Sequence, residues 1–377
     1  MLNCASICVN QKLVPGAHSG KMSTGPTYDG DAAQKPGPAP APPSAACHRL
    51  RDCALAMNEE TVSRFWLSVI VPSHNGERWL ADALQSIVDQ GNAGIEVIVV
   101  DSSDAATSCE IARGFFDRLA LRLFRRPDLL SWMAKTNFAV ATATADWVCM
   151  LHQDDLWVSG RCAAITGWLA ACPRSVMHLH AVYVIDAAGK RFGQWRCALP
   201  TSVLPVPPQM LLERLLVQNF VAIPTPTIRR EAYLQVGGLD EQLWYTADWD
   251  LYLKLLSVGD VYYHPEPLAG FRIHGSSLTM SGSRSVEDFR RQMEIVLDRH
   301  IGKLARSEQK TARRLGHASI AMNVALAALS SGRPGPVIAA VAKLLSLGPR
   351  GLLRYFRDSR IVERAYPRLR ARLAGRL

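Results

Sequence analysis

The 377-residue sequence has no CxxC pair and no regular spacing among its nine cysteines. Because the number is also odd, a disulfide framework is disfavoured, and we expect reduced thiols. No apolar run is long enough to span a bilayer, since the best candidates, 320–329 and 337–347, are short and the second contains Lys343. The N-terminus lacks the charged region and apolar core of a signal peptide. We therefore expect a cytoplasmic location.

Most of the composition is that of an ordinary globular protein, with 48% hydrophobic and 20% charged residues. Residues 1–62 are different, because they are rich in Gly, Pro, Ala and Ser, and we predict them to be disordered. The net charge of +10 is uneven. From Arg284 onward, basic residues outnumber acidic ones by roughly three to one. This region favours phosphate-rich partners or an anionic membrane face.

Strands and helices are predicted to alternate after this first segment. Apolar runs predict strands at 67–71, 95–100, 121–124 and 147–151. Amphipathic runs predict helices at 79–90, 107–119, 131–142 and 160–171. This alternation is typical of an α/β fold with a mostly parallel, Rossmann-like sheet flanked by helices.

The second half of the chain is predicted to have a less regular order of strands and helices. Strands are expected at 178–185 and 261–263, a hairpin turn at 186–189, and helices at 209–218 and 246–256. Residues 286–377 predict a helical extension with a Gly/Pro break at 332–336.

Carboxylates follow two of the predicted strands. Asp101 ends the second strand, and Asp154 and Asp155 follow the fourth. In open α/β sheets ligands bind at this end of the strands, so the three acids point to one crevice. Adjacent carboxylates repel each other, and a divalent cation shared with a phosphate would relieve that repulsion. The alternative is a solvated acidic turn in which an aspartate caps the next helix.

Three further sets of residues each have two interpretations. Asp248 and Asp250 fall in the first turn of a predicted helix, where carboxylates could serve only as caps. His178 and His180 share one strand face and could bind a metal, but no third ligand is near in sequence, so ordinary strand histidines are favoured. Large aromatics near the crevice could stack on a bound ligand or pack in its walls: Trp157, Trp244 and Trp249.

A series of short motifs occurs in a fixed order along residues 66–279. They are Val71-Pro-Ser-His-Asn75, Val99-Val-Asp101, Ala134-Lys-Thr-Asn137, Gln153-Asp-Asp155, Ile228-Arg-Arg230, Val236-Gly-Gly-Leu-Asp240, Ala247-Asp-Trp-Asp-Leu251 and Arg272-Ile-His274. The ordered set resembles the family 2 glycosyltransferases, which have the GT-A fold and include many inverting enzymes. It implies a GT-A domain over 63–283, followed by a basic helical region over 284–377.

The resemblance implies a role for each matching residue. Asp101 would bind the nucleotide base, and the loop with Pro72, His74 and Asn75 would lie against the nucleoside. Asp154 would contact the ribose or sugar, and Asp155 would hold Mg²⁺ or Mn²⁺ against the diphosphate. His274 has two interpretations, as a further metal or diphosphate ligand or as a plain hydrogen-bonding residue. Lys135 would contact the diphosphate. Asp248 would be the catalytic base that takes a proton from the acceptor hydroxyl.

The sequence departs from the family pattern at four positions. His152 and Ser102 stand where aspartates are frequent, Ala247 replaces a usual glutamate, and Thr136 replaces a common arginine. These differences affect the identity of the donor more than the type of reaction. The expected partners are a nucleotide-sugar donor, commonly UDP-linked, and a glycan or lipid-linked acceptor of cell-surface polysaccharide synthesis.

Two other classes of protein share parts of this pattern. A sugar nucleotidyltransferase needs a Gly-rich basic phosphate loop after its first strand, and Pro72-Ser-His-Asn-Gly76 is not one. A nucleotide-sugar-binding protein without turnover would not need Asp155 and Asp248 together. We expect no nucleic-acid partner, because no RNA-binding motif is visible. The basic C-terminal helices predict either peripheral binding to the inner membrane face or a helical cap on the catalytic domain.

Overall fold

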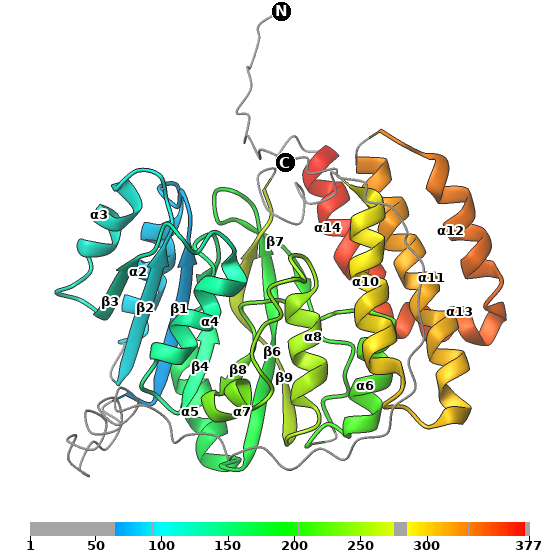
Figure 1. Cartoon of the computed structure of the whole chain (residues 1–377), viewed down its shortest axis with the longest axis horizontal. Helices are drawn as coiled ribbons and strands as arrows, with labels where there is room; N and C mark the ends of the chain where they lie inside the picture. The colour runs from blue at the N-terminus through cyan, green and yellow to red at the C-terminus, as the bar shows by residue number, and fades with distance from the viewer. Residues whose placement is uncertain (1–64, 92–93, 203, 275–284, 331, 374–377) are drawn as a thin grey trace, which may run out of the picture. The chain divides into compact units, whose positions relative to one another are not determined.

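The computed structural model describes residues 65–91, 94–202, 204–274, 285–330 and 332–373. The predicted disordered segment 1–62 and the predicted boundary near 283 lie outside these residues. The described part forms a nine-stranded sheet with helices on both faces, followed by five helices (Figure 1).

The N-terminal half of the sheet is parallel, as predicted. Its strands lie in the order β3 (Ala120–Arg125), β2 (Ile95–Asp101), β1 (Leu67–Ser73) and β4 (Trp147–Met150). The strands β1, β2 and β4 are buried along their whole length, because helices cover both of their faces. Their carboxyl ends therefore meet at one edge, where ligands bind in sheets of this kind.

The C-terminal half of the sheet is mixed. The order continues with β8 (Thr227–Arg229), β6 (Ser175–Ile185), β9 (Asp260–Arg272) and β5 (Leu156–Trp157). Outside this order, β7 (Arg191–Trp195) pairs with the C-terminal part of β6. Only the β6–β9 pair is parallel among these described strands. The predicted hairpin is confirmed, because β6 and β7 are antiparallel and Asp186 accepts hydrogen bonds from the amides of the turn.

The strand β9 is much longer than the predicted 261–263. It continues through Pro265 and Pro267, which lack the N–H that a sheet ladder needs. The register against β6 shifts on both sides of Ala181, so the prolines lie in an irregularity of the pairing. This bulge carries the strand on to Arg272, at the edge where the candidate site lies.

Two hydrophobic clusters cover the two faces of the sheet. On one face, the odd-numbered residues of β1 pack with α2 (Leu80–Val88), α3 (Thr107–Arg113) and α5 (Arg161–Ala171). On the other face, Ile70 and its neighbours pack with α4 (Trp132–Thr142), α6 (Pro208–Val217), α7 (Arg230–Gln235) and α8 (Ala247–Leu255). The alternation of side chains along a strand divides the core in this way.

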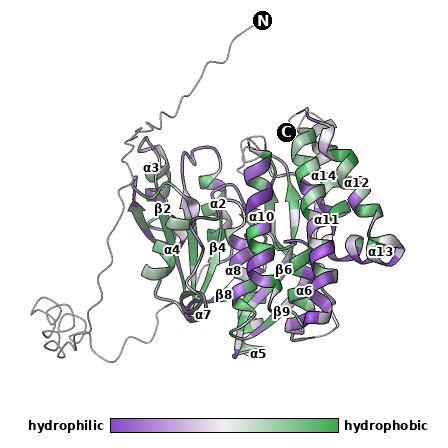
Figure 2. Ribbon diagram, turned by 45° about the vertical axis from the view of Figure 1, so that its right-hand side comes forward, coloured by the Kyte–Doolittle hydropathy of each residue, from purple (hydrophilic) through white to green (hydrophobic). Residues whose placement is uncertain are grey.

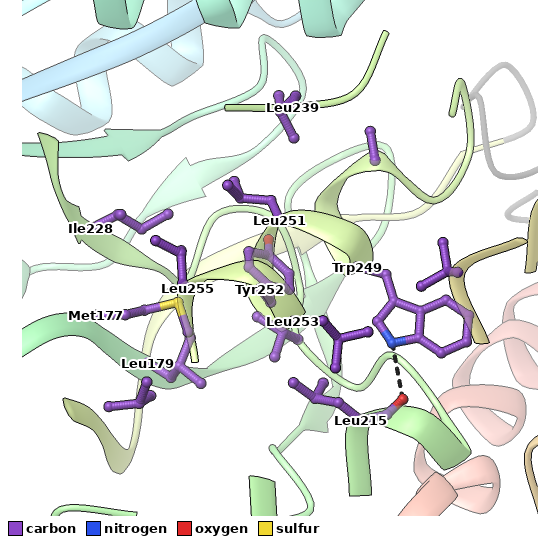
Figure 3. Close-up of a cluster of buried hydrophobic side chains, with 14 of the residues drawn as sticks. Met177, Leu179, Leu215, Ile228, Leu239, Trp249, Leu251, Tyr252, Leu253 and Leu255 are labelled. Atoms are coloured by element: carbon purple, nitrogen blue, oxygen red, sulfur yellow. Dashed lines mark hydrogen bonds between the residues drawn. The ribbon is translucent and has the colours of Figure 1, made fainter. Parts of the chain in front are cut away.

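The helix α8 lies in the middle of the larger cluster (Figure 3). Leu251 and Tyr252 are fully buried there. Trp249 is also held in place, because its indole Nε1 donates to the Leu215 carbonyl at 2.9 Å. The first turn of α8, which carries Asp248, is therefore fixed by the packing of the rest of the helix.

The C-terminal extension is helical, as predicted. It consists of α10 (Val286–Ile301), α11 (Arg306–Ser330), α12 (Gly335–Leu345), α13 (Gly348–Ser359) and α14 (Ile361–Leu373). The apolar face of α10 shares the core of α8, whereas Leu315, Leu344 and Tyr355 form a smaller cluster that joins α11, α12 and α13. Within the described residues, no single helix could cross a membrane, although α12 and α13, bent by 115°, meet the length and composition criteria together.

Candidate active site

A cavity of 1170 Å³ lies at the carboxyl ends of the strands. Most of the residues predicted for the site line it: Pro72, His74, Asn75, Lys135, Asp154, Asp155, Asp248 and His274. The structure therefore brings together residues that are up to about two hundred positions apart in the sequence. The walls also include side chains from α10, α11 and α14 of the C-terminal extension.

The loop after β1 is held in an unusual conformation. Asn75 has a φ of 49°, in the left-handed region that asparagine tolerates better than most residues. The Gln153 side chain fastens the loop, because its Oε1 accepts from the His74 amide at 2.8 Å and its Nε2 donates to the His74 carbonyl at 3.0 Å. Gln153 was not predicted to have a role, although its position directly before the paired aspartates was a signal.

Asp101 lies behind this loop and does not line the cavity. Its carboxylate is fully buried and accepts hydrogen bonds from Ser103 Oγ at 2.7 Å and Cys109 Sγ at 3.4 Å. The same serine hydroxyl accepts the Asn75 amide at 2.7 Å. In this structure Asp101 therefore supports the loop, and its contact with a nucleotide base stays a prediction.

Lys135 reaches the underside of the same loop from α4. Its Nζ donates to the Ser73 carbonyl and to Ser102 Oγ, both at 2.8 Å. Burial lowers the pKa of Lys135 to about 8, although the nearby Asp101 charge acts in the opposite direction. Ser102, which stands where the family often has an aspartate, thus serves as a hydrogen-bond partner for this lysine.

Asp154 and Asp155 have different partners although they are neighbours. The Asp154 Oδ2 atom lies 2.9 Å from His274 Nε2, whose ring packs against Trp79 with the centroids 4.3 Å apart. Burial acts to raise the pKa of both acids. For Asp154 the hydrogen bond from His274 outweighs burial and the pKa falls, whereas for Asp155 the charge of Asp154 adds to the effect of burial and the pKa rises well above its usual range.

Arg272, at the end of β9, organises the aspartate pair. Its backbone amide donates to Asp155 Oδ1 at 2.9 Å, and its Nε donates to the Asp154 carbonyl at 2.6 Å. The guanidinium also donates to the carbonyls of Asp186 and Ala187 in the hairpin turn. Arg272 belongs to one of the sequence motifs, but this positioning role was not predicted for it.

The carboxylates at this end of the cavity suit a divalent cation that also binds oxygen atoms of the substrate. Among the described residues, no three His, Cys, Asp or Glu side chains form a complete metal cage. Mg²⁺ needs no such cage, because it is commonly held by one or two carboxylates together with substrate phosphates. Asp154, which is half-buried, and Asp155, which is buried, supply two adjacent carboxylates, and a cation between them would offset the repulsion that helps to raise the Asp155 pKa.

Asp248 lies in the cavity wall at the start of α8. Its side chain is 8% exposed, and its Oδ2 accepts from Asn219 Nδ2 at 2.9 Å. Burial raises the Asp248 pKa to about 6, and the bonds from the Trp249 amide and Asn219 limit that rise. The carboxylate is therefore ionised at pH 7 and can accept a proton. No motif identified Asn219 in the sequence.

The histidines at 178 and 180 belong to a different, packed environment. His178 lies 3.1 Å from His264 and 2.7 Å from Ser175 Oγ, and His180 lies 2.5 Å from an Arg161 nitrogen. Burial lowers the pKa of His178 to about 3. These partners agree with ordinary strand histidines rather than a metal pair.

The tryptophans pack in walls instead of standing free. Trp157 is 5% exposed in the smaller core, and Trp249 is bound to Leu215 as described above. The Trp244 indole lines the cavity and donates to Asp288 Oδ2 at 2.5 Å. Of the three, Trp244 is the least buried and the best placed to touch a ligand.

Comparison with known proteins agrees with this arrangement. Residues 68–235 match the model of "Glycosyl transferase family 2". An uncharacterised glycosyltransferase of Rickettsia typhi is 24% identical over 243 residues, which cover 62% of this chain and 71% of the relative.

Solved structures share the fold at 17% sequence identity. The S. aureus TarS 1–349 structure in complex with UDP-GlcNAc has a TM-score of 0.53, with 80% of this chain and 91% of TarS 1–349 covered. The mannosyltransferase PcManGT of Pyrobaculum calidifontis, in complex with GDP-Man and Mn²⁺, has a TM-score of 0.50, with 86% and 94% covered. A longer TarS structure is covered over 43% of its length. The segment 68–235 therefore matches glycosyltransferase family 2, and the described part of the chain has the GT-A fold of these glycosyltransferases.

Proposed function

We propose that the protein transfers a sugar from a nucleoside diphosphate, UDP in particular, to a hydroxyl of a glycan or lipid-linked acceptor. The reaction would invert the anomeric carbon and serve cell-surface polysaccharide synthesis. The observation that carries the proposal is that the adjacent carboxylates of Asp154 and Asp155 line the same cavity as the ionised carboxylate of Asp248. UDP-GlcNAc in the TarS structure supports the choice of nucleotide.

The donor would occupy the half of the cavity below the loop of His74 and Asn75. Asp154 and Asp155 would hold a divalent cation against its diphosphate, and the Mn²⁺ in the PcManGT structure supports this assignment. A bound Mg²⁺ or Mn²⁺ offsets the negative charge that develops on the leaving diphosphate. Arg272 keeps both carboxylates in place through its bonds to Asp155 Oδ1 and the Asp154 carbonyl.

Asp248 would act as the general base. A pKa of about 6 leaves its carboxylate ionised at neutral pH while keeping it basic enough to take the proton of an acceptor hydroxyl. Direct attack by that hydroxyl on an α-linked donor gives an inverted product. The chain's own contribution is therefore to orient the hydroxyl and to receive its proton.

A membrane-facing location on the cytoplasmic side would suit a lipid-linked acceptor. Of the thirteen exposed large hydrophobic side chains in the part of the chain that the structure describes, nine lie from Leu326 to Tyr366. The helix α12 is strongly apolar (Figure 2). Basic residues occur in α12, at Lys343, and in α13, at Arg350 and Arg357. Exposed apolar groups next to positive charge favour anionic lipid surfaces. Co-sedimentation with phosphatidylglycerol vesicles, reduced by an Ile338→Ser/Leu353→Ser variant, tests this part of the proposal.

The reaction itself is tested with a panel of UDP-, GDP- and dTDP-linked sugars. We expect slow release of nucleotide from one donor class in the presence of Mn²⁺ and none in the presence of EDTA. Because hydrolysis of the donor can proceed without an acceptor, the panel names the donor before the acceptor is known. Release that is unaffected by EDTA for every donor would contradict the metal-dependent mechanism.

A further inference from the structure

The part of the cavity beyond Asp248 has a different lining from the donor half. Its walls come from α10, α11 and α14, and the side chains there are mostly apolar: Phe289, Met293, Leu326, Leu329, Val362 and Tyr366. A volume of 1170 Å³ is above the usual range for one small ligand, about 300–1,000 Å³. The cavity therefore has room for a second substrate beside the donor.

Polar residues separate the base from this apolar wall. Asn323 Nδ2 donates to Gln218 Oε1 at 2.6 Å, and an Arg364 nitrogen lies 3.4 Å from Asn323 Oδ1. Gln218 adjoins Asn219, which binds Asp248. All of these residues line the cavity. The order from the base outward is thus a carboxylate, a band of amide and guanidinium groups, and an apolar rim.

The rim is open to solvent even though it is apolar. Leu326 and Leu329 lie three residues apart on α11, on one helix face, and are 37% and 44% exposed. Val362 and Tyr366 are more exposed still, and lie four apart on α14. Contiguous exposed apolar side chains at the mouth of a cavity are typical of a binding groove.

We propose that the acceptor is amphiphilic, with its hydroxyl-bearing head at Asp248 and its hydrocarbon tail along Leu326, Leu329, Val362 and Tyr366. This inference rests on the proposed function and adds the chemical class of the acceptor. A free glycan offers hydroxyls that an apolar wall cannot bond, whereas a hydrocarbon chain gains free energy from leaving water. The continuity of the groove with the catalytic base fixes which end of the acceptor lies where.

Alkyl β-D-glucosides from methyl to decyl, below their micelle concentrations, serve as probes in calorimetric titrations. For the wild type we expect affinity to rise by up to about fourfold for each added methylene that enters the groove. The double variant Leu326→Ser/Leu329→Ser should lose most of this dependence on chain length. Leu234→Ser is the matched control, because Leu234 is 43% exposed, as Leu329 is at 44%, but lies on α7 outside the cavity.

A second titration separates the two proposals. We expect UDP with Mn²⁺ to bind the wild type, the double variant and the control equally, because the substituted leucines lie outside the donor half. Failure of the wild type to bind UDP would contradict the proposed function, while the glucoside series would still report on the groove. An equal chain-length dependence in the double variant, or none in the wild type, would overturn the amphiphilic acceptor.

Discussion

Asp248 and Asp250 lie two residues apart in the first turn of α8 and face opposite surroundings. Asp248 lines the cavity and accepts a hydrogen bond from Asn219. Asp250 is fully buried against α10, where its Oδ1 lies 2.8 Å from His300 Nε2 and 2.9 Å from an Arg299 nitrogen. The pKa of Asp248 is raised and that of Asp250 is lowered, so their contributions to the stability of the fold depend on pH in opposite ways.

Asp248 should reduce the stability of the protein at the pH where it works. Burial raises its pKa from the ordinary 3.8 to about 6, so its contribution is fully favourable below pH 3.8 and is lost as the pH rises through about 6. We expect Asp248→Asn to raise the free energy of unfolding at pH 8 by up to about 3 kcal/mol. The gain should shrink at pH 4.5. Urea unfolding at both pH values measures it, and equal gains at the two would contradict the raised pKa.

Asp250 should stabilise the fold. Its Oδ2 also lies 3.1 Å from Lys254 Nζ, and removal of the carboxylate would leave the buried His300 ring and the partly exposed Lys254 and Arg299 without this partner. We expect Asp250→Ala to cost about 3–5 kcal/mol of unfolding free energy. Burial acts to raise the pKa of Asp250, but the hydrogen bond from His300 and the nearby positive charges outweigh it, and the pKa is lowered. The contribution of Asp250 to stability is therefore present above pH 3.8 and is lost in stronger acid.

An exposed ion pair provides the control for this experiment. Asp128 bonds Arg126 at 2.6 Å, but its side chain is more than half exposed. Asp128→Ala should leave the free energy of unfolding nearly unchanged, because water screens an exposed ion pair. Similar losses of unfolding free energy in Asp128→Ala and Asp250→Ala would contradict a stabilising role for the buried Asp250 carboxylate.

Asn219 should set the pH range of the reaction. Its hydrogen bond lowers the pKa of Asp248, so Asn219→Ala is expected to move the acidic limb of the pH–kcat profile to higher pH. We expect kcat to fall about threefold at pH 6 and to change little at pH 8. Asn219→Asp should shift the limb further, because it adds a negative charge beside Asp248. A uniform loss at all pH values would assign Asn219 a merely structural role.

Binding of the cation should release protons. The pKa of Asp155 is raised by burial and by the Asp154 charge, and a metal must displace whatever proton the pair carries. We expect calorimetry of Mn²⁺ with UDP at pH 6, in buffers of different ionisation enthalpy, to show proton release that Asp155→Asn abolishes. An apparent binding enthalpy that is independent of the buffer would contradict this prediction.

The sequence predicted the regular part of the fold well, because buried parallel strands such as 67–71 and 95–100 are continuous apolar runs. Asp101, Asp154 and Asp155 could be placed at strand ends from that pattern alone. The length of β9 was missed, since Pro265 and Pro267 normally end a strand and only a bulge in its pairing with β6 accommodates them.

Contacts between distant segments could not be predicted in the same way. The pairing of His274 with Asp154 joins residues 120 positions apart, and that of Asn219 with Asp248 joins a loop to a helix. Neither residue spacing nor hydrophobic period carries such information. The apolar groove also depends on how α11 and α14 meet the cavity, which the amphipathic pattern of each helix does not specify.

The central claim is that the aspartate pair binds the donor with a cation while Asp248 acts only in the chemical step. It is tested most directly by measuring UDP-sugar binding with Mn²⁺ and donor turnover on the same preparations of wild type, Asp155→Ala and Asp248→Asn. We predict that Asp155→Ala loses both binding and turnover, whereas Asp248→Asn binds the donor like the wild type and transfers sugar at least about a hundredfold more slowly. Wild-type turnover in Asp248→Asn, or undiminished metal-dependent binding in Asp155→Ala, would contradict the account.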